Sequence, residues 1–292
     1  MNNCIVASAR IERYSFLLRQ TRVFFDDFAS EVRCQALVTG KARDSFVIGE
    51  DKYLLRSYAL PITAYTCQIG NSYCIQRVFR NNEEVSPFHL SEFDILECGL
   101  RYTSNEEAMA VVEKFISHLC AELSEKYRIP REISDACREK FQRITYADAL
   151  KYIVSIQDND LYHSPGPGYI VDLSHSLNNL NPLFLTDFPY SRTSWASSLK
   201  SPGFTTRFNL MCPYVGEIAE GSERNLDQGY FQTKFTALGI DDKLSWYRQA
   251  LKPDVGPVTV FAIGLERLAM WLFGYSDIRE CNPNASQLGA EE

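Results

Sequence analysis

The segment Gln76–Glu97 reads QRVFRNNEEVSPFHLSEFDILE. Its two ends are rich in aromatic and β-branched residues, and the pairs Asn81-Asn82 and Ser86-Pro87 between them are typical of turns. We therefore predict two antiparallel strands joined by a polar loop. This hairpin decides the fold, because it calls for an antiparallel sheet rather than a parallel one.

The hairpin also carries residues that can bind a nucleotide. Arg80 follows the first strand, His89 lies in the loop and Phe93 begins the returning strand. A guanidinium binds phosphate through two parallel hydrogen bonds, and an aromatic face can stack on a purine. An edge hairpin with solvated charges has the same pattern, and that is the more frequent occurrence for a hairpin taken alone.

A second informative segment, Val258–Gly274, reads VTVFAIGLERLAMWLFG. We predict a strand that passes through Gly264 into a helix carrying Glu266 and Arg267. The helix macrodipole does not favour an arginine in the first turn, so Arg267 needs another partner. A bound polyphosphate and a neighbouring carboxylate are both adequate partners.

The remaining patterns predict a mixed order of strands and helices. The expected strands are Lys52–Ala59, Ser72–Phe79, Phe93–Leu100, Phe208–Val215 and Val258–Ile263, and the expected helices are Tyr14–Val32, Glu106–Tyr127, Thr145–Ile156 and Leu265–Phe273. Residues 158–201 are rich in loop-forming residues. No regular alternation of strand, helix and strand is present, so we predict an α+β fold around an antiparallel sheet flanked by helices, in one domain spanning residues 1–292.

The composition limits which binding partners and which cell compartment we expect. The 292-residue chain has a formal net charge of -7 and no run of Lys/Arg, so nucleic acid is not the expected partner. Its nine cysteines contain no C-x-x-C pair, which favours reduced thiols. Charged residues at Arg10, Glu12 and Arg13 interrupt any signal peptide, and no apolar stretch reaches about 20 residues. We expect a cytoplasmic protein that does not bind a membrane.

Taken together and in this order, the two segments resemble motifs 2 and 3 of the class II aminoacyl-tRNA synthetases. The sequence between them agrees with the aspartyl/asparaginyl branch, most closely with the asparaginyl enzymes, in the blocks Phe141–Leu150, Pro182–Pro189 and Phe208–Arg224. The resemblance runs from about residue 10 to residue 282. It implies the class II antiparallel sheet and a homodimer joined through the helix that begins near Tyr14. The anticodon-binding β-barrel that usually precedes this core has no counterpart in the sequence, as in synthetase-derived asparagine synthetases.

The resemblance assigns a role to each matching residue. It implies that ATP and Mg²⁺ bind and that an amino acid is activated as its adenylate. Arg80 and Arg267 would be the catalytic residues, with Arg80 on the α-phosphate and Arg267 on the adenine and the bent triphosphate. His89, Phe93 and Glu217 would complete the ATP site. Glu217 and Asn209 would be the metal ligands, and Arg224, with Ser57 and Ser222, would bind the side chain of the substrate amino acid.

Several positions depart from the family pattern. Asn82 stands where motif 2 usually has a glutamate that reads adenine, and Asn209 replaces an aspartate that usually shares Mg²⁺ with the residue matching Glu217. A neutral carbonyl binds the ion less tightly than a carboxylate, so we expect a weaker metal site. Ala59 replaces a glutamine of the amino-acid pocket, and Ile62 stands where aspartyl enzymes have a lysine.

Further departures are found in motifs 1 and 3. Val260 and Ala262 take glycine positions of motif 3, where glycine usually allows close approach of the nucleotide, and Cys34 replaces a proline of motif 1.

Three functions remain open at this point. The first is amino-acid activation with transfer to ammonia, a small metabolite, a carrier protein or a tRNA acceptor end, without recognition of a full tRNA. The second is a catalytically inactive relative that binds an amino acid or a nucleotide as a regulatory protein. The third is aminoacylation of tRNA with the help of a separate tRNA-binding module. The sequence does not choose the amino acid or the acceptor.

Overall fold

The predicted hairpin is present in the computed structural model, which describes residues 2–39, 46–50, 52–81, 86–152, 181–190 and 196–281. Strands β5 (Ser72–Phe79) and β6 (Glu92–Arg101) pair antiparallel, from Ser72 opposite Gly99 to Phe79 opposite Glu92. The loop residues 82–85, which include the Asn82 position, lie outside the described part of the chain.

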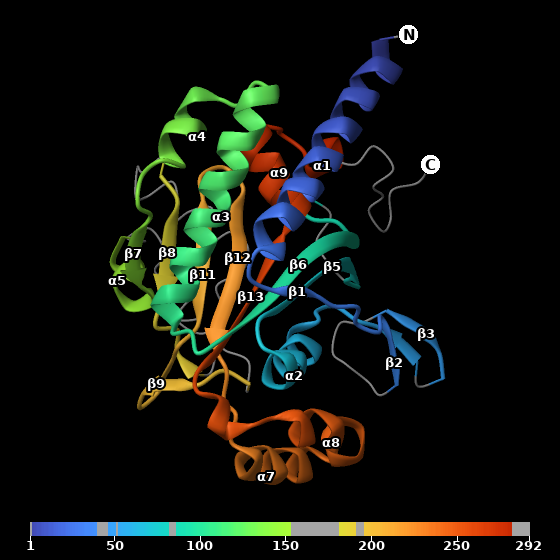
Figure 1. Ribbon diagram of the computed structural model, residues 1–292, viewed down its shortest axis with the longest axis vertical. Coiled ribbons are helices and arrows are strands. Elements are labelled where there is room, and N and C mark those ends of the chain that lie inside the picture. The colour runs from blue at the N-terminus through green and yellow to red at the C-terminus, as the bar shows by residue number, and fades with distance from the viewer. Residues whose placement is uncertain are drawn as a thin grey trace.

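This hairpin is part of an eight-stranded sheet in the order β1-β5-β6-β13-β12-β11-β8-β7 (Figure 1). The other members are β1 (Ser30–Glu31), β13 (Val258–Gly264), β12 (Gly216–Glu223), β11 (Phe208–Cys212), β8 (Leu183–Thr186) and β7 (Gln142–Thr145). The central pairs are antiparallel, and the outer pairs β1–β5 and β7–β8 are parallel. The predicted α+β class is therefore confirmed.

The two faces of the sheet bury different cores, because successive strand residues point to opposite sides. On one side Leu96, Cys98 and Leu100 of β6 pack against the long helices, and on the other Ile95 belongs to a separate cluster. The first face is covered by α1 (Asn2–Asp26), α3 (Asn105–Lys126) and α9 (Leu265–Phe273), which are seen together in Figure 1. The short helix α4 (Arg131–Ala136) follows α3.

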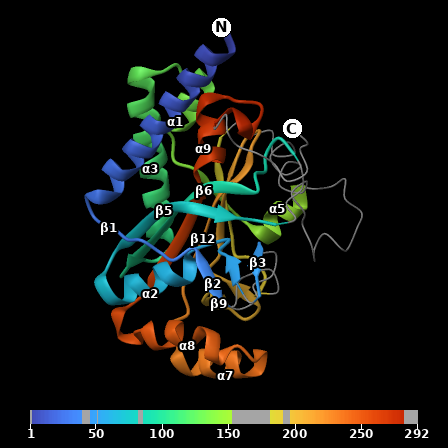
Figure 2. The same ribbon diagram turned by 90° about the vertical axis from the view of Figure 1, so that its right-hand side faces the viewer.

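The second core lies under α2 (Ala59–Ile69). Gly99 of β6 permits the close approach of this helix, since an added Cβ would lie 2.0 Å from Thr66 Oγ1. Helices α7 (Gln228–Leu238) and α8 (Asp241–Ala250) continue the cluster with Phe231, Phe235 and Tyr247, which are fully buried. Both views place this helix pair next to α2 at the lower end of the molecule (Figure 2).

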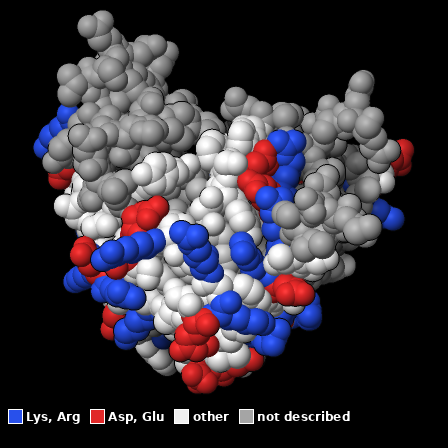
Figure 3. All heavy atoms as spheres, turned by 90° about the horizontal axis from the view of Figure 1, so that it is seen from above, with Lys and Arg blue, Asp and Glu red and all other residues white. Residues whose placement is uncertain are grey.

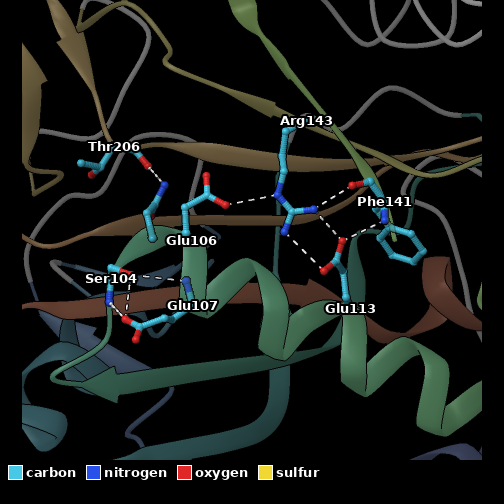
Figure 4. Close-up of polar contacts among 8 residues, drawn as sticks. Ser104, Glu106, Glu107, Glu113, Phe141, Arg143 and Thr206 are labelled. Atoms are coloured by element: carbon cyan, nitrogen blue, oxygen red, sulfur yellow. Dashed lines mark hydrogen bonds and ion pairs between the residues drawn. The ribbon is translucent and has the colours of Figure 1, made fainter. Parts of the chain in front are cut away.

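Polar contacts hold the far edge of the sheet to α3 (Figure 4). Arg143 of β7 donates from Nη1 to Glu113 Oε1 at 2.7 Å and pairs through Nε with Glu106 Oε2 at 3.2 Å. The backbone nitrogen of Phe141 donates to the same Glu113 oxygen at 2.9 Å. At the start of α3, Ser104 and Glu107 form a reciprocal capping box that satisfies the first backbone donors of the helix.

Smaller elements complete the described chain. They are the three-stranded sheet β2 (Leu37–Thr39), β4 (Lys52–Leu54) and β3 (Val47–Gly49), the hairpin β9 (Leu199–Ser201) and β10 (Phe204–Thr205), helix α5 (Tyr146–Tyr152) and the 3₁₀ turns η3 (Pro253–Val255) and η4 (Ile278–Glu280). Among the described residues no helix is long and apolar enough to cross a bilayer. The eight cysteines whose side chains are described, from Cys34 to Cys281, are each buried with a free thiol.

Some predicted boundaries are wrong. The first helix runs over Asn2–Asp26 rather than Tyr14–Val32, and the strand predicted for Lys52–Ala59 ends at Leu54, before α2. Helix α2 was not predicted, because it contains β-branched residues, which are more frequent in strands. Thr63 and Thr66 bond their hydroxyls to the carbonyls of Ala59 and Ile62, four residues earlier, at 2.6 and 2.8 Å. Of the predicted loop 158–201, the described part includes β8 and β9.

Candidate active site

One cavity of about 820 Å³ contains most of the residues that the sequence singled out. Its walls come from the β5–β6 hairpin, β12, β13, the first turn of α9 and the chain that enters α2. The predicted residues on its surface are Ser57, Arg80, His89, Phe93, Glu217, Arg224 and Arg267. The other two, Asn209 and Ser222, contact Glu217 and Arg224 directly. All nine predicted residues are therefore brought together, and their individual roles stay predictions.

Arg80 and Phe93 come together because the hairpin ladder ends beside them. The last paired residues are Phe79 and Glu92, and the backbone nitrogen of Arg80 then donates to Ser91 O at 2.8 Å. This register places Arg80 Cζ 4.9 Å from the centroid of the Phe93 ring. A cation over an aromatic face is a favourable contact, and both groups line the cavity. The pair presents one guanidinium and one ring side by side.

Arg267 lines the same cavity from helix α9. It lies in the first turn of α9, after Gly264 where β13 ends, and its Nη1 donates to Glu217 O at 2.8 Å. Nη2 and Nε donate to Phe88 O at 2.7 and 3.2 Å. The neighbouring Glu266 does not supply the carboxylate partner considered above, since both of its oxygens accept from the backbone nitrogen of Asp94, at 3.0 and 2.9 Å.

Arg224 lies at the α2 end of the cavity and is almost buried, with 7% of its surface exposed. Its Nη1 donates to Ser222 Oγ at 3.2 Å and its Nε to Thr63 Oγ1 at 3.3 Å. Ser222 Oγ is shared in turn with Ser197 Oγ at 2.8 Å. Neutral hydroxyls orient this guanidinium on the cavity surface, where it can bind an acceptor oxygen of a small ligand.

Glu97 is a site residue that the sequence analysis did not single out. Its carboxyl is fully buried on β6, and its Oε1 accepts from the backbone nitrogen of Tyr58 at 2.7 Å. Burial raises the pKa of this carboxyl to about 7, although Tyr58, Ser57, Arg224 and Arg80 all lower it. A signal was present, because Glu97 is a charged residue inside an otherwise apolar strand.

Phe88, His89 and Leu90, which precede β6, line part of the cavity. His89 Nδ1 and Ser86 Oγ are 2.7 Å apart, and the backbone nitrogen of Phe88 also donates to Ser86 Oγ at 3.2 Å. The backbone nitrogen of Ile278, at the start of η4, donates to Pro87 O at 2.8 Å. These contacts place the His89 imidazole on the cavity surface beside Phe88, whose carbonyl holds Arg267.

An acidic corner is formed where β11 meets β12. Asn209 Nδ2 donates to Glu217 Oε2, and Asn209 Oδ1 accepts from Arg207 Nε at 2.9 Å. Arg207 also donates from Nη2 to Glu220 Oε2 at 2.9 Å. Burial and the charge of Glu220 raise the pKa of Glu217, while Arg207, Arg267 and Arg80 lower it. Three guanidinium groups therefore act on one partly buried carboxyl, and two of them belong to the predicted ATP site.

The donor set decides how a magnesium ion would fit here. Mg²⁺ that is bound with a nucleotide commonly uses one or two protein carboxylates and keeps several waters. Glu217 fits as one such ligand. Asn209 does not fit in its present contacts, because its carbonyl oxygen is turned to Arg207 and its amide nitrogen faces Glu217. The described residues contain no cluster of three or more His, Cys, Asp or Glu that could hold a metal by itself.

Comparisons with known proteins agree with this arrangement. The sequence profile of the tRNA synthetases class II (D, K and N) matches residues 38–285. The cytoplasmic asparagine–tRNA ligase of Saccharomyces cerevisiae is 24% identical over 92% of this chain and 52% of its own length. The asparagine–tRNA ligase of Thermus thermophilus is 26% identical over 80% of this chain and 58% of its own length. The chain therefore spans about half the length of these relatives.

Solved structures show the same fold. Asparaginyl-tRNA synthetase from Pyrococcus horikoshii, complexed with asparaginyl-adenylate, superposes with a TM-score of 0.86 at 22% identity, over 97% of this chain and 69% of that one. The enzyme of Entamoeba histolytica, in complex with the same adenylate, gives a TM-score of 0.83 at 22% identity over 98% of this chain and 68% of that one. The profile covers well over half of the sequence, and the chain belongs to the class II tRNA synthetase family of the D, K and N enzymes.

Proposed function

We propose that this chain is an ATP-dependent ligase of the AMP-forming type that activates aspartate, asparagine or a closely related amino acid as its adenylate. The observation that carries the proposal is the meeting of Arg80, Arg267 and Arg224 in one cavity, where Arg80 also lies over the Phe93 ring. Ligase chemistry agrees with the asparagine–tRNA ligases among the relatives. The identity of the activated amino acid is itself part of this proposal.

The geometry supports an in-line displacement. The carboxylate of the amino acid attacks the α-phosphorus of ATP, a new P–O bond forms, and the bond to the bridging oxygen breaks as pyrophosphate leaves. Negative charge builds on the oxygens around phosphorus, and Arg80 is placed to stabilise it. Arg267 would hold the outer phosphates, and the Phe93 ring would support the adenine. Mg²⁺, when bound with ATP, would neutralise phosphate charge near Glu217.

The other end of the cavity supports recognition of a polar side chain. Arg224 would bind the side-chain oxygen of the amino acid, with Ser222 holding the guanidinium and Ser57 lining the same cavity. Glu97 lies behind this end, where its carboxyl can accept or donate a hydrogen bond depending on its protonation. Ala59 lines the cavity at a position where the family usually has a longer polar residue, which leaves additional room.

The charge of the chain indicates which acceptors could take the activated amino acid. The chain has a net charge of -7, and the face seen in Figure 3 carries acidic and basic side chains intermixed rather than one basic tract. Such a surface favours ammonia, a small metabolite, a carrier protein or a tRNA acceptor end over a whole tRNA. Transfer to tRNA with a separate tRNA-binding module is the alternative within the same chemistry.

Helix α1 supports a homodimer as the assembly. Ile11, Val23 and Phe28 are exposed on or just after this helix, at 50, 50 and 38% of their surfaces. In a two-fold dimer the same face of α1 would meet itself, so an exposed apolar residue on the contacting face would be buried.

The experiment that tests the function is amino-acid-dependent exchange of labelled pyrophosphate into ATP, over a panel of amino acids. We expect exchange with aspartate, asparagine or a close analogue, and none without an amino acid. Ammonia, tRNA or candidate amines added afterwards would identify the acceptor by the product formed. If ATP binds but no amino acid supports exchange, the proposal is wrong.

A regulatory protein that binds but does not activate is the second candidate. Asn209 favours it, because this residue presents an amide nitrogen to Glu217 where a metal-binding carboxylate would help catalysis. The same exchange experiment separates the two functions, provided that nucleotide binding is measured alongside it.

A further inference from the structure

Arg207 has no role in the function proposed above, although it is fixed at the acidic corner of the cavity. Its Nε donates to Asn209 Oδ1 and its Nη2 to Glu220 Oε2, both at 2.9 Å. Its guanidinium carbon lies 4.8 Å from the centroid of the Phe188 ring, and only 18% of the side chain is exposed. The cation is therefore held in one position by three different groups.

The hydrogen bonds fix the orientation of Asn209. Arginine has only donors, so the Asn209 atom that faces Arg207 Nε must be the carbonyl oxygen. The other end of the amide is then a nitrogen, and it donates to the carboxylate of Glu217. As a result, Asn209 offers its acceptor to a guanidinium and its donor to Glu217. An N–H group occupies the direction from which a metal ion would approach both residues.

A divalent ion needs oxygen ligands that are free to approach it closely, at about 2.0–2.1 Å for Mg²⁺. At this corner the Asn209 oxygen and the Glu220 carboxylate already face Arg207. A guanidinium supplies positive charge at the same place, through directed hydrogen bonds and without an ion that must be bound and released. The negative charges of Glu217 and Glu220 are thus balanced by Arg207 rather than by a metal ion.

We propose that Arg207 stands in for a divalent cation at this corner, so that the chain holds no metal ion of its own and binds only the one that arrives with ATP. The second half of this statement rests on the proposed function, since it takes ATP as the ligand. The first half concerns the protein alone. Arg207 is accordingly a positioning residue, which orients Asn209 and Glu220 and through Asn209 the carboxylate of Glu217.

The test is a titration of the nucleotide-free full chain with Mn²⁺, with bound ion measured by electron paramagnetic resonance. We expect no tight binding by the wild type. The double variant R207A/N209D removes the cation and adds a carboxylate beside Glu217, so it should bind one Mn²⁺ per chain at least about tenfold more tightly. The variant R207Q/N209D keeps more of the packing on Phe188 and should behave alike, which guards against misfolding of the first.

The matched control is R143A. Arg143 also pairs with two carboxylates and is 20% exposed, but its partners Glu106 and Glu113 lie on α3, and none of the three residues lines the cavity. R143A should bind Mn²⁺ no better than the wild type. An equal gain in R143A would contradict the proposal, and so would tight Mn²⁺ binding by the wild type or the absence of any gain in both double variants.

A second titration, with an ATP analogue that cannot be cleaved between its α- and β-phosphates, separates this inference from the proposed function. The wild type should then bind one Mn²⁺ per nucleotide, and two would contradict the role of Arg207. Failure of the analogue to bind at all would count against the proposed function. It would leave the nucleotide-free titration to decide the inference by itself.

Discussion

The two walls of the cavity differ in how closely they follow the family pattern. On the β5–β6 and α9 side, Arg80, Phe93 and Arg267 stand at the expected positions and face one cavity. On the β11–β12 side, Asn209 has replaced a carboxylate, and Arg207 fills its surroundings. Under the proposed function, the nucleotide side follows the family pattern, while the side chains and charges beside it differ from that pattern.

The largest expected effects belong to the nucleotide side. R80A and R267A should each reduce adenylate formation by at least about 10³-fold, since each guanidinium would stabilise phosphate charge in the proposed reaction. Pyrophosphate exchange measures the loss, and circular dichroism should show an unchanged fold. Exchange near the wild-type rate in either variant would contradict the proposal, because the side of the cavity that matches the family would then not be needed for activity.

The next largest effect should come from the amino-acid end. R224L removes the guanidinium that Ser222 and Thr63 orient, and should lower kcat/KM for the amino acid by about 10²–10³-fold, with little change in KM for ATP. Exchange kinetics at varied amino acid and at varied ATP give both constants. An unchanged amino-acid preference would show that the side-chain pocket lies elsewhere.

Glu97 predicts a pH dependence of stability. Its folded pKa of about 7 lies above the unfolded value, because burial disfavours the charged form. The folded state therefore holds the proton more tightly, and its contribution to stability is present below about pH 4.3 and is lost as the pH rises through 7. Over this window the loss should amount to roughly 3 kcal/mol.

The variant E97Q cannot ionise, so it should escape this loss. Denaturant unfolding at pH 4.5 and at pH 8 would measure the free energy of unfolding of both proteins. The difference between E97Q and the wild type should grow by roughly 3 kcal/mol toward pH 8. Two parallel pH curves would show that the carboxyl is ionised throughout, contrary to the buried environment.

The smallest effect is expected for N209D alone. With Arg207 still in place, the new carboxylate would pair with that guanidinium, so pyrophosphate exchange should change by less than about tenfold. A much larger gain, accompanied by a new dependence on free Mg²⁺, would mean that the rebuilt corner is merely a damaged metal site. This variant thus tests whether the β11–β12 side of the cavity contributes less to activity than the β5–β6 and α9 side.

The sequence predicted the elements with strong periodicity and the residues that carry charge on them. The hairpin strands, α3 and α9 appear within one or two residues of their predicted bounds, because alternation and capping signals are local. Strand β12 was not predicted, since Gly216, Glu217, Glu220 and Gly221 are unusual strand residues. Glu217 and Glu220 line the cavity, and Gly221 is required because an added Cβ would lie 2.4 Å from Phe208 Cζ.

What the sequence could not show is contact between distant segments. Arg207 has no motif around it, and its role depends on a pairing between β11 and β12 that brings Glu220 opposite Asn209. Glu97 was visible as a charge in an apolar strand, but its link to Ser57 and Arg224 depends on how α2 packs against the sheet. Helices α7 and α8 were not predicted, because a buried face such as Phe231 and Phe235 needs its packing partner to be interpreted.

The most direct test of the account is the isolation of an enzyme-bound adenylate. The wild type would be incubated with ATP, asparagine or aspartate, and pyrophosphatase, passed rapidly through a desalting column and analysed by mass spectrometry. The account predicts one aminoacyl-adenylate per active site in the wild type and none in R80A or R267A. Retention of ATP without any adenylate, for every amino acid supplied, would contradict it.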